Sequence, residues 1–159
     1  MMDFMQATKL KTIEEFLTEG EKPKCLIVDI DGTIAKMGDR NPFDWKKVGL
    51  DFPNKEIISE IRKLVKENPE LFVFFITGRE GAAHKETRKW IQEHLPFLEE
   101  DFRLLMRKDG DRRKNAVVKK ELFYNNIEGK FIVDLAFEDD EDVIKLWKSF
   151  GIPVREVSS

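Results

Sequence analysis

Two aspartates separated by a single residue stand at the end of the first long apolar run of the sequence, residues 24–30. Because side chains alternate along an extended chain, the carboxylates of Asp29 and Asp31 project to the same side. One carboxylate can attack an electrophile or hold a metal ion while the other moves a proton. Gly32 permits a turn that a side chain would block, and Thr33 offers a hydroxyl to phosphate oxygens. We therefore interpret the string DIDGT as a catalytic segment rather than a simple Asp-Gly turn.

The elements that must position these side chains are predicted by hydrophobic periodicity. Continuous apolar runs predict buried strands at residues 24–30, 71–76, 102–106 and 131–137, with an edge strand at residues 152–157. Apolar residues at helical spacing lie between these runs, around residues 57–65, 90–95, 117–122 and 143–147. Strands that alternate with helices indicate a parallel sheet covered by helices on both faces. The predicted fold class is therefore α/β.

Polar side chains stand at the carboxyl ends of the predicted strands, where parallel α/β sheets bind their ligands. The four strand ends carry Asp29, Thr77, either Arg107 or Lys108, and Glu138 with Asp139. An acid, a hydroxyl, a base and a pair of acids are thus expected at one edge of the sheet. This set predicts a ligand-binding site at that edge.

The composition is that of one folded domain. The chain has 159 residues, 28 of them basic and 31 acidic, so its formal net charge of −3 neither demands nor excludes a nucleic-acid partner. The longest unbroken apolar run, residues 71–76, is too short to cross a bilayer, and no secretory signal is visible at the start. Cys25 has no second cysteine to pair with and is expected to be a buried thiol. We expect a cytoplasmic protein with no membrane partner, and the oligomeric state stays open.

The string DIDGTI, residues 29–34, resembles motif I of the haloacid dehalogenase (HAD) superfamily of phosphohydrolases. Thr77 resembles the motif II hydroxyl residue, Lys114 the motif III lysine, and Glu138 with Asp139 the acids of motif IV. The resemblance implies a three-layer Rossmann-like fold with a central parallel sheet, and Mg²⁺ as the cofactor. Lys114 has one competitor for its slot, because Lys108 also lies in the matching region.

The same resemblance implies a role for each motif residue. Asp29 attacks phosphorus to form an aspartyl-phosphate, and Asp31 first protonates the leaving oxygen and then deprotonates the hydrolytic water. Thr77 and Lys114 hold the oxygens of the transferring phosphoryl group. The implied metal-site residues are Asp29, Asp31, Glu138 and Asp139.

A closer resemblance covers the chain from residue 24 onward. The strings DIDGTIAKM, ITGRE, TRKW, GDRRKNAVVKKE and LAFEDD resemble the 3′-phosphatase domains of the bacteriophage polynucleotide kinase family. The resemblance implies substrate contacts from Gly32, Thr33, Arg40, Gly78, Arg79 and Asp111. The domain is therefore expected at residues 24–159, after an N-terminal helical extension at residues 1–23.

The chain departs from that family at two points. It has Glu138-Asp139 where the phage enzyme has two aspartates, so that either residue could be the metal ligand. It also has no GxxxxGK[ST] loop, and we therefore expect no kinase activity.

The predicted function is Mg²⁺-dependent removal of 3′-phosphates from DNA or RNA ends, with a separate kinase or ligase as a possible partner. Residues 32–71 and 78–102 are too short for a large cap domain, and an open site suits a phosphate on a large molecule. One alternative is a phosphatase for mononucleotides or other small esters, with Phe43 and Trp45 as a minimal lid. The others are a phosphoacceptor module that retains the phosphoryl group and an inactive module that binds nucleic acid ends. Trp45 is also a candidate nucleobase contact.

Overall fold

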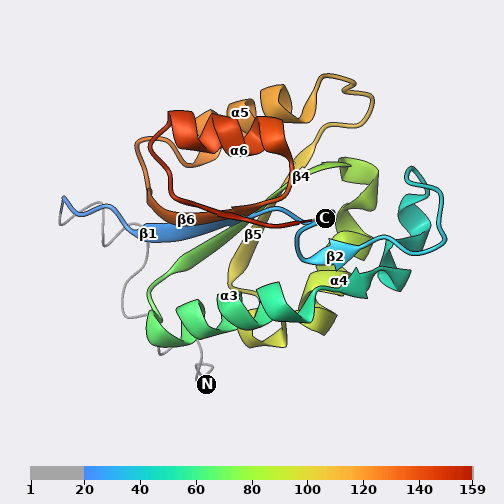
Figure 1. Cartoon of the computed structure of the whole chain (residues 1–159), viewed down its shortest axis with the longest axis horizontal. Coiled ribbons are helices and arrows are strands. Elements are labelled where there is room, and N and C mark those ends of the chain that lie inside the picture. The colour runs from blue at the N-terminus through green and yellow to red at the C-terminus, as the bar shows by residue number, and fades with distance from the viewer. Residues whose placement is uncertain (1–19, 159) are drawn as a thin grey trace.

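Five parallel strands form the centre of the computed structural model, which describes residues 20–158 (Figure 1). Their order across the sheet is β5-β4-β1-β6-β7. The strands are β1 (Lys24–Val28), β4 (Phe72–Glu80), β5 (Phe102–Arg107), β6 (Ile132–Glu138) and β7 (Val154–Glu156). All neighbouring pairs are parallel, as predicted, and the expected edge strand is β7.

Helices cover both faces of this sheet, which confirms the predicted three-layer Rossmann-like α/β fold. The main helices are α3 (Lys55–Glu67), α4 (His84–His94), α5 (Asn115–Asn126) and α6 (Glu141–Ser149). Helices α5 and α6 lie above the sheet in Figure 1, and α3 and α4 lie below it. Short 3-10 helices η2 (Gly81–Ala83) and η3 (Pro96–Leu98) flank α4.

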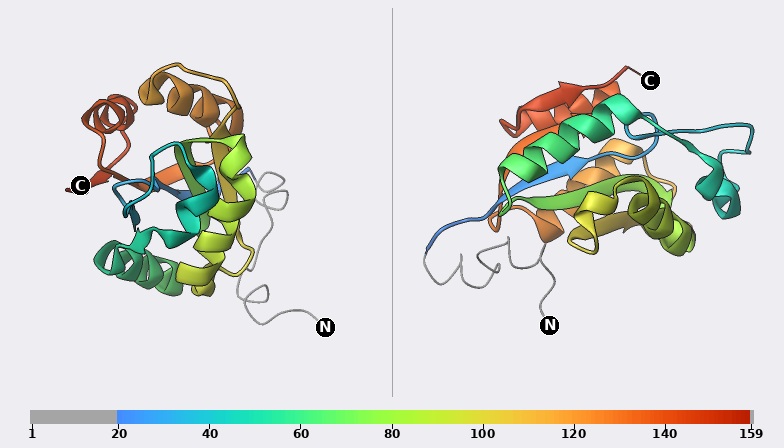
Figure 2. Two further views of the ribbon diagram at one scale, coloured as in Figure 1. Left: turned by 90° about the vertical axis from the view of Figure 1, so that its right-hand side faces the viewer. Right: turned by 90° about the horizontal axis from the view of Figure 1, so that it is seen from below.

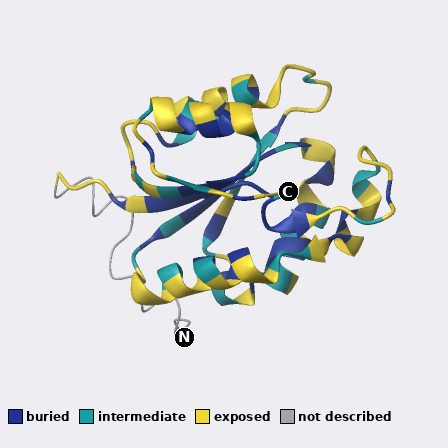
Figure 3. Cartoon of the chain, viewed as in Figure 1, coloured by how far each residue is buried: buried dark blue, intermediate teal, exposed yellow. Residues whose placement is uncertain are grey.

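The core is split into two layers by the alternation of side chains along the strands. On β1, Leu26 and Val28 pack in the hydrophobic cluster that includes residues of α3 and α4. Cys25 and Ile27 point the other way, into the cluster with residues of α5 and α6. Burial raises the pKa of the Cys25 thiol. Figure 3 shows the buried sheet between helices whose outer faces are exposed.

Helix α5 buries the apolar Val118, and it buries a lysine on the same side. Val117 is 47% exposed, and Glu121 also lies on the surface. Lys119 and Phe123 are buried instead. The orientation of α5 is therefore one that brings a lysine toward the carboxyl ends of the strands.

A small insertion, which we call the flap (residues 35–53), follows β1. Strand β2 (Ala35–Lys36) pairs antiparallel with β3 (Phe52–Pro53), and the 3-10 helix η1 (Trp45–Leu50) lies between them. Figure 2 shows the flap projecting beyond the ends of the sheet strands. Asn54 joins it to the core, because its side chain accepts from Ile57 at the start of α3 and donates to the carbonyl of Thr33. The flap is the small substitute for the cap domain that the segment lengths excluded.

Two expectations about the rest of the chain have different outcomes. Up to residue 19, the predicted N-terminal helical extension lies outside the described residues. Among residues 20–158, no helix has the length and apolar character needed to cross a membrane.

Candidate active site

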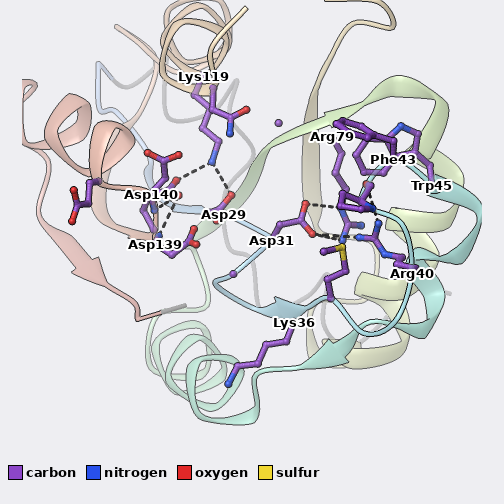
Figure 4. A pocket seen from close by; sticks show the side chains of 17 residues that line it. Asp29, Asp31, Lys36, Arg40, Phe43, Trp45, Arg79, Lys119, Asp139 and Asp140 are labelled. Carbon is purple, nitrogen blue, oxygen red and sulfur yellow. Dashed lines mark hydrogen bonds and ion pairs between the residues drawn. The ribbon is translucent and has the colours of Figure 1, made fainter. Parts of the chain in front are cut away.

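A cavity of about 850 Å³ opens at the carboxyl ends of the strands (Figure 4). Strand ends, the start of α6, helix α5 and the flap all contribute to its lining. The lining includes Asp29, Asp31, Gly32, Arg40, Phe43, Trp45, Gly78, Arg79, Lys119, Glu138 and Asp139. The structure thus brings together most of the residues expected at this edge of the sheet.

Asp29 is a fixed and ionised carboxylate at the base of the cavity. It follows β1, where its backbone N–H donates to the Phe137 carbonyl at 3.0 Å. Lys119 Nζ lies 2.7 Å from Oδ1 of Asp29, and the Thr33 hydroxyl donates to Oδ2 at 2.8 Å. Burial by itself raises the pKa of Asp29, but the Lys119 charge and the hydrogen bonds outweigh it and lower that pKa. Asp29 is therefore held as an anion with both oxygens oriented.

The lysine that reaches this carboxylate is Lys119, whereas Lys114 was expected from the sequence. Lys119 is 2% exposed, and its Nζ also lies 2.9 Å from Oε2 of Glu138. Burial disfavours the ammonium, but Asp29 and Glu138 together raise the pKa of Lys119 above its ordinary value. Lys114 is an exposed residue at the N-cap of α5 and does not line the cavity. The structure therefore places Lys114 outside the cavity.

Arg107, the strand-end base considered for the same edge, has a positioning role. Its guanidinium donates to the carbonyl of Gly78 at 2.8 Å and to Oδ1 of Asn115 at 2.6 Å. These bonds tie the end of β4 to the first residue of α5. Lys108, the other candidate, is exposed and does not line the cavity.

Three carboxylates form the acidic end of the cavity, and one oxygen from each lies within 4.8 Å of the others. They belong to Asp29, Glu138 and Asp139. Burial and the neighbouring Asp29 carboxylate raise the pKa of Asp139 to about 7. An all-oxygen donor set with excess negative charge fits a hard divalent cation such as Mg²⁺.

The contacts of the motif IV pair distinguish its two members. Glu138 is 2% exposed, and its Oε2 accepts from Lys119. Its Oε1 accepts from the backbone N–H groups of Asp139 and Asp140, both at 3.2 Å. Both oxygens of Glu138 therefore have protein donors, whereas Asp139 is only partly buried and accepts at one oxygen, Oδ1, from the Thr33 hydroxyl at 3.4 Å. Of this pair, Asp139 is the residue suited to ligate a cation.

Gly32 is required by the approach of Asp139. Its φ of 82° lies in the left-handed region, and a Cβ at this position would overlap the Asp139 carboxylate. The turn after Asp29 can therefore close against the acidic cluster only with glycine. This observation supplies a structural reason for the glycine in the DIDGT string.

Asp31 points away from the acidic cluster and toward two arginines. Its oxygens accept from Nε and Nη2 of Arg79 at 3.0 and 2.8 Å, and Arg40 Nη2 lies 3.8 Å away. The Asp31 side chain is 46% exposed, so it can meet a ligand in the cavity. Its carboxylate is not part of the three-carboxylate cluster, and the structure does not bring it to the expected metal site.

Asp51 is a residue of the charged network beside the cavity that the sequence analysis missed. Its side chain is 0% exposed and lies between the guanidinium groups of Arg40 and Arg79. Arg40 donates to both oxygens, at 2.7 and 3.0 Å, and Arg79 Nη2 donates to Oδ2 at 2.9 Å. Asp51 therefore fixes both arginines that were expected to contact substrate. No local sequence signal identifies it, because a lone aspartate in an irregular loop is commonplace.

Two other residues expected in the site, Thr77 and Asp111, do not line the cavity. Thr77 is 1% exposed, and its hydroxyl accepts from the backbone N–H of Arg79 at 3.1 Å, so it supports the irregular end of β4 that carries Gly78. Asp111 does not line the cavity and instead pairs with Arg113 at 2.7 Å. The structure thus does not bring Asp111 to the predicted substrate site.

Comparison with known proteins indicates a phosphatase family. Residues 23–159 match the family model of the polynucleotide kinase PNKP phosphatase domain. A protein of Autographa californica nuclear polyhedrosis virus, named "Putative bifunctional polynucleotide kinase/RNA ligase", is 29% identical over 147 residues, which are 91% of this chain and 21% of that protein.

Solved structures extend the comparison. A chain of the Pnkp1/Rnl/Hen1 RNA repair complex superposes with a TM-score of 0.76 at 30% identity, over 86% of this chain and 43% of that one. The class C acid phosphatase of Bacillus anthracis shares the fold at 14% identity, with a TM-score of 0.58 over 97% of this chain and 73% of that one. The chain thus spans less than half the length of the polynucleotide repair proteins it matches. The family match and the fold together show that the chain is a HAD-type phosphatase domain and belongs to the family of polynucleotide kinase phosphatase domains.

Proposed function

We propose that this protein is a Mg²⁺-dependent phosphatase that removes 3′-phosphates from polynucleotide ends through an aspartyl-phosphate on Asp29. The observation that carries the proposal is the environment of Asp29, a buried carboxylate kept ionised and oriented by Lys119 and Thr33. A nucleophile must be deprotonated and fixed before it can attack in line. Asp29 meets both conditions inside a cavity that also contains the Asp31 carboxylate.

The residues divide the two chemical steps between them. The Asp29 carboxylate attacks phosphorus, the bond from phosphorus to the sugar oxygen breaks, and Asp31 gives its proton to that oxygen. Asp31 then takes a proton from water, the water oxygen attacks phosphorus, and phosphate leaves with regeneration of Asp29. Lys119 lies 2.7 Å from the attacking carboxylate, where its charge stabilises the phosphoryl oxygens.

Asp29 and Asp139 would hold the cation, and Glu138 would keep Lys119 in place beside them. When bound, Mg²⁺ supplies positive charge between two anions that otherwise repel each other. Asp31 lies outside this cluster and remains available for proton transfer. Its pairing with Arg79 sets the direction of the carboxylate toward the cavity.

The choice of substrate is supported by the relatives. The viral relative has polynucleotide kinase and RNA ligase in its name, and the solved neighbour comes from a complex named for RNA repair. On the basis of these names, we propose that the substrate is a 3′-phosphorylated DNA or RNA end. We also propose that a kinase or a ligase is a partner in repair. The small flap leaves the cavity open enough for a chain end to enter.

The test compares phosphate release from a 3′-phosphorylated oligonucleotide, the matching 3′-mononucleotide and an aryl phosphate, each with Mg²⁺. Asp29→Asn should abolish turnover, whereas Asp44→Asn, at a partly exposed flap residue, is the matched control and should not. Faster turnover of the oligonucleotide than of both small esters supports the proposal. Equal rates on all three would favour a phosphatase for small esters, and a long-lived phosphoprotein would favour a phosphoacceptor. Retained activity in Asp29→Asn would exclude the nucleophile.

A further inference from the structure

The flap places an unusually exposed aromatic side chain on the wall of the cavity. Phe43 is 78% exposed, although it lines the same cavity as Asp29 and Asp31. An aromatic ring that stays exposed to water does not contribute the favourable free energy of burying its apolar surface. A ring at the wall of a binding cavity can recover that free energy when a ligand covers it.

The backbone of the flap holds Phe43 in a defined position. The backbone N–H of Asp44 donates to the Asn41 carbonyl at 2.9 Å, which closes a turn with Pro42 and Phe43 at its centre. The Asn41 side chain accepts from the N–H of Phe43 at 2.9 Å. Arg40 Nη1 donates to the carbonyl of Pro42 at 3.0 Å. The ring is therefore carried by a turn that is bonded from both sides.

Trp45 supports this ring from the protein side. The two rings meet edge to face, with centroids 6.2 Å apart and an interplanar angle of 86°. The Trp45 indole N–H donates to Glu80 at 3.3 Å, and the Arg40 guanidinium lies 5.9 Å from its ring centroid. Because the indole donor already has a partner, the aromatic pair can offer a surface for stacking but no free hydrogen-bond donor to read a base.

The charges of the two walls give the orientation of a bound nucleotide. The wall at the start of α6 carries Asp139, Asp140 and Glu141, which repel the phosphodiester backbone of a strand. The opposite wall is formed by the flap, with Phe43 and Trp45 (Figure 4). A phosphate seated at Asp29 therefore directs its sugar and base past Asp31 toward the flap.

We infer that Phe43, supported by Trp45, is a stacking platform for the nucleobase of the nucleotide that carries the phosphate. This inference rests on the proposed function, since it names the part of a polynucleotide end that the same site recognises. Stacking accepts any base, because every base has a π-face. The protein should therefore prefer a strand with a terminal base, without selecting the identity of that base.

The experiment measures kcat/KM for a 3′-phosphorylated oligonucleotide and for the same strand ending in a stable tetrahydrofuran abasic unit with a 3′-phosphate. One stacked base is worth about tenfold in affinity, so the wild type should prefer the base-bearing strand by about tenfold. Phe43→Ala should bring this ratio close to one, and Phe43→Trp should restore it. Phe52→Ala is the matched control, because Phe52 is a flap phenylalanine with 63% exposure that does not line the cavity, and it should keep the wild-type ratio.

The outcomes separate the platform from the proposed function. Efficient turnover of both strands by the wild type with a ratio near one would overturn the platform and leave the phosphatase assignment intact. An equal loss on both strands in Phe43→Ala would also overturn it, because a stacking contact acts only when a base is present. Absence of phosphate release from either strand in the wild type would overturn the proposed function itself.

Discussion

At the scale of single residues, one buried ammonium balances the acidic end of the cavity. Lys119 forms ion pairs with Asp29 and Glu138, and both of these carboxylates are buried as well. Removing one partner from a buried ionic network leaves charges without compensation, which costs far more than the net value of the intact pair. We therefore expect the activity of the site and the stability of the fold to depend on the same side chain.

Lys119→Ala should lower the free energy of unfolding by about 3 kcal/mol in the absence of metal, because a buried charge pair is broken on one side. It should also lower kcat by about a hundredfold or more, as expected for loss of a group that stabilises transition-state charge. Denaturant titration and steady-state kinetics measure the two effects. Lys114→Ala is the control, since Lys114 is exposed, and it should change stability by less than about 0.5 kcal/mol. A comparable loss in both variants would contradict the assignment.

The sequence reveals some site residues and hides others for a physical reason. Asp29, Asp31 and Asp139 could be found because they stand directly after buried strands, where the topology fixes their location. The lysine could not be chosen reliably, because Lys114 stands at the N-cap of α5 and Lys119 within the helix, and the packing of α5 decides which of them reaches the cavity. One signal was available: Lys119 precedes the apolar Phe123 by one helical turn, which puts both on one face.

At the scale of elements, the flap is joined to the core by a charged bridge. Asp51, at the end of the flap, binds Arg40 in the flap and Arg79 at the end of β4. Arg79 in turn holds Asp31, so the position of the proposed proton-transfer residue depends on the same bridge. The Trp90 indole N–H adds a contact from α4, because it donates to the Asp51 carbonyl at 3.0 Å. Flap position and catalytic geometry are therefore coupled.

Asp51→Ala should destabilise the protein by about 3 kcal/mol, since two buried guanidinium groups lose a carboxylate partner. The variant should also lose activity, because Arg79 no longer has a fixed position from which to orient Asp31. Chemical denaturation and phosphate release report the two effects. Asp44→Ala removes a flap acid whose pair with Lys47 is long, at 3.7 Å, and should cost less than about 0.5 kcal/mol. Unchanged stability in Asp51→Ala would show that the bridge does not hold the flap.

The sheet could be predicted from the sequence and the flap could not. Residues 71–76 form a continuous apolar run, which is the sequence pattern typical of a strand buried on both faces. Strands β2 and β3 have two residues each, so neither shows a periodicity that a sequence pattern can detect. The contacts of Asp51 join segments far apart in the chain, and only the folded structure brings them together.

At the scale of the whole molecule, the acidic cluster links stability to pH, and we expect it to link stability to metal as well. The pKa of Asp139 is raised from 3.8 to about 7, so the folded state binds this proton more tightly than the unfolded chain. Stability from this group is therefore present at low pH and lost as pH rises from about 4 to about 7. A cation that requires the ionised carboxylate has the opposite dependence, because it must displace the proton.

Millimolar Mg²⁺ should raise the melting temperature more at about pH 8 than at about pH 6, since the Asp139 proton competes with the metal only below its pKa. Thermal melts with and without Mg²⁺ at the two pH values test this. Asp139→Asn should remove the Mg²⁺ effect at both values, while Asp142→Asn, at an exposed acid on α6, should preserve it. A shift of equal size at both pH values would contradict this linkage.

The position of the single cysteine has a practical consequence. Cys25 lies on β1, is 0% exposed, and packs in the hydrophobic cluster that includes residues of α5 and α6. Burial raises the pKa of its thiol, so the folded protein offers no thiolate to alkylating reagents. A cysteine introduced on the flap would then be the one reactive thiol of the folded chain. A fluorophore attached there would report flap movement in an otherwise unmodified protein, without prior removal of a native cysteine.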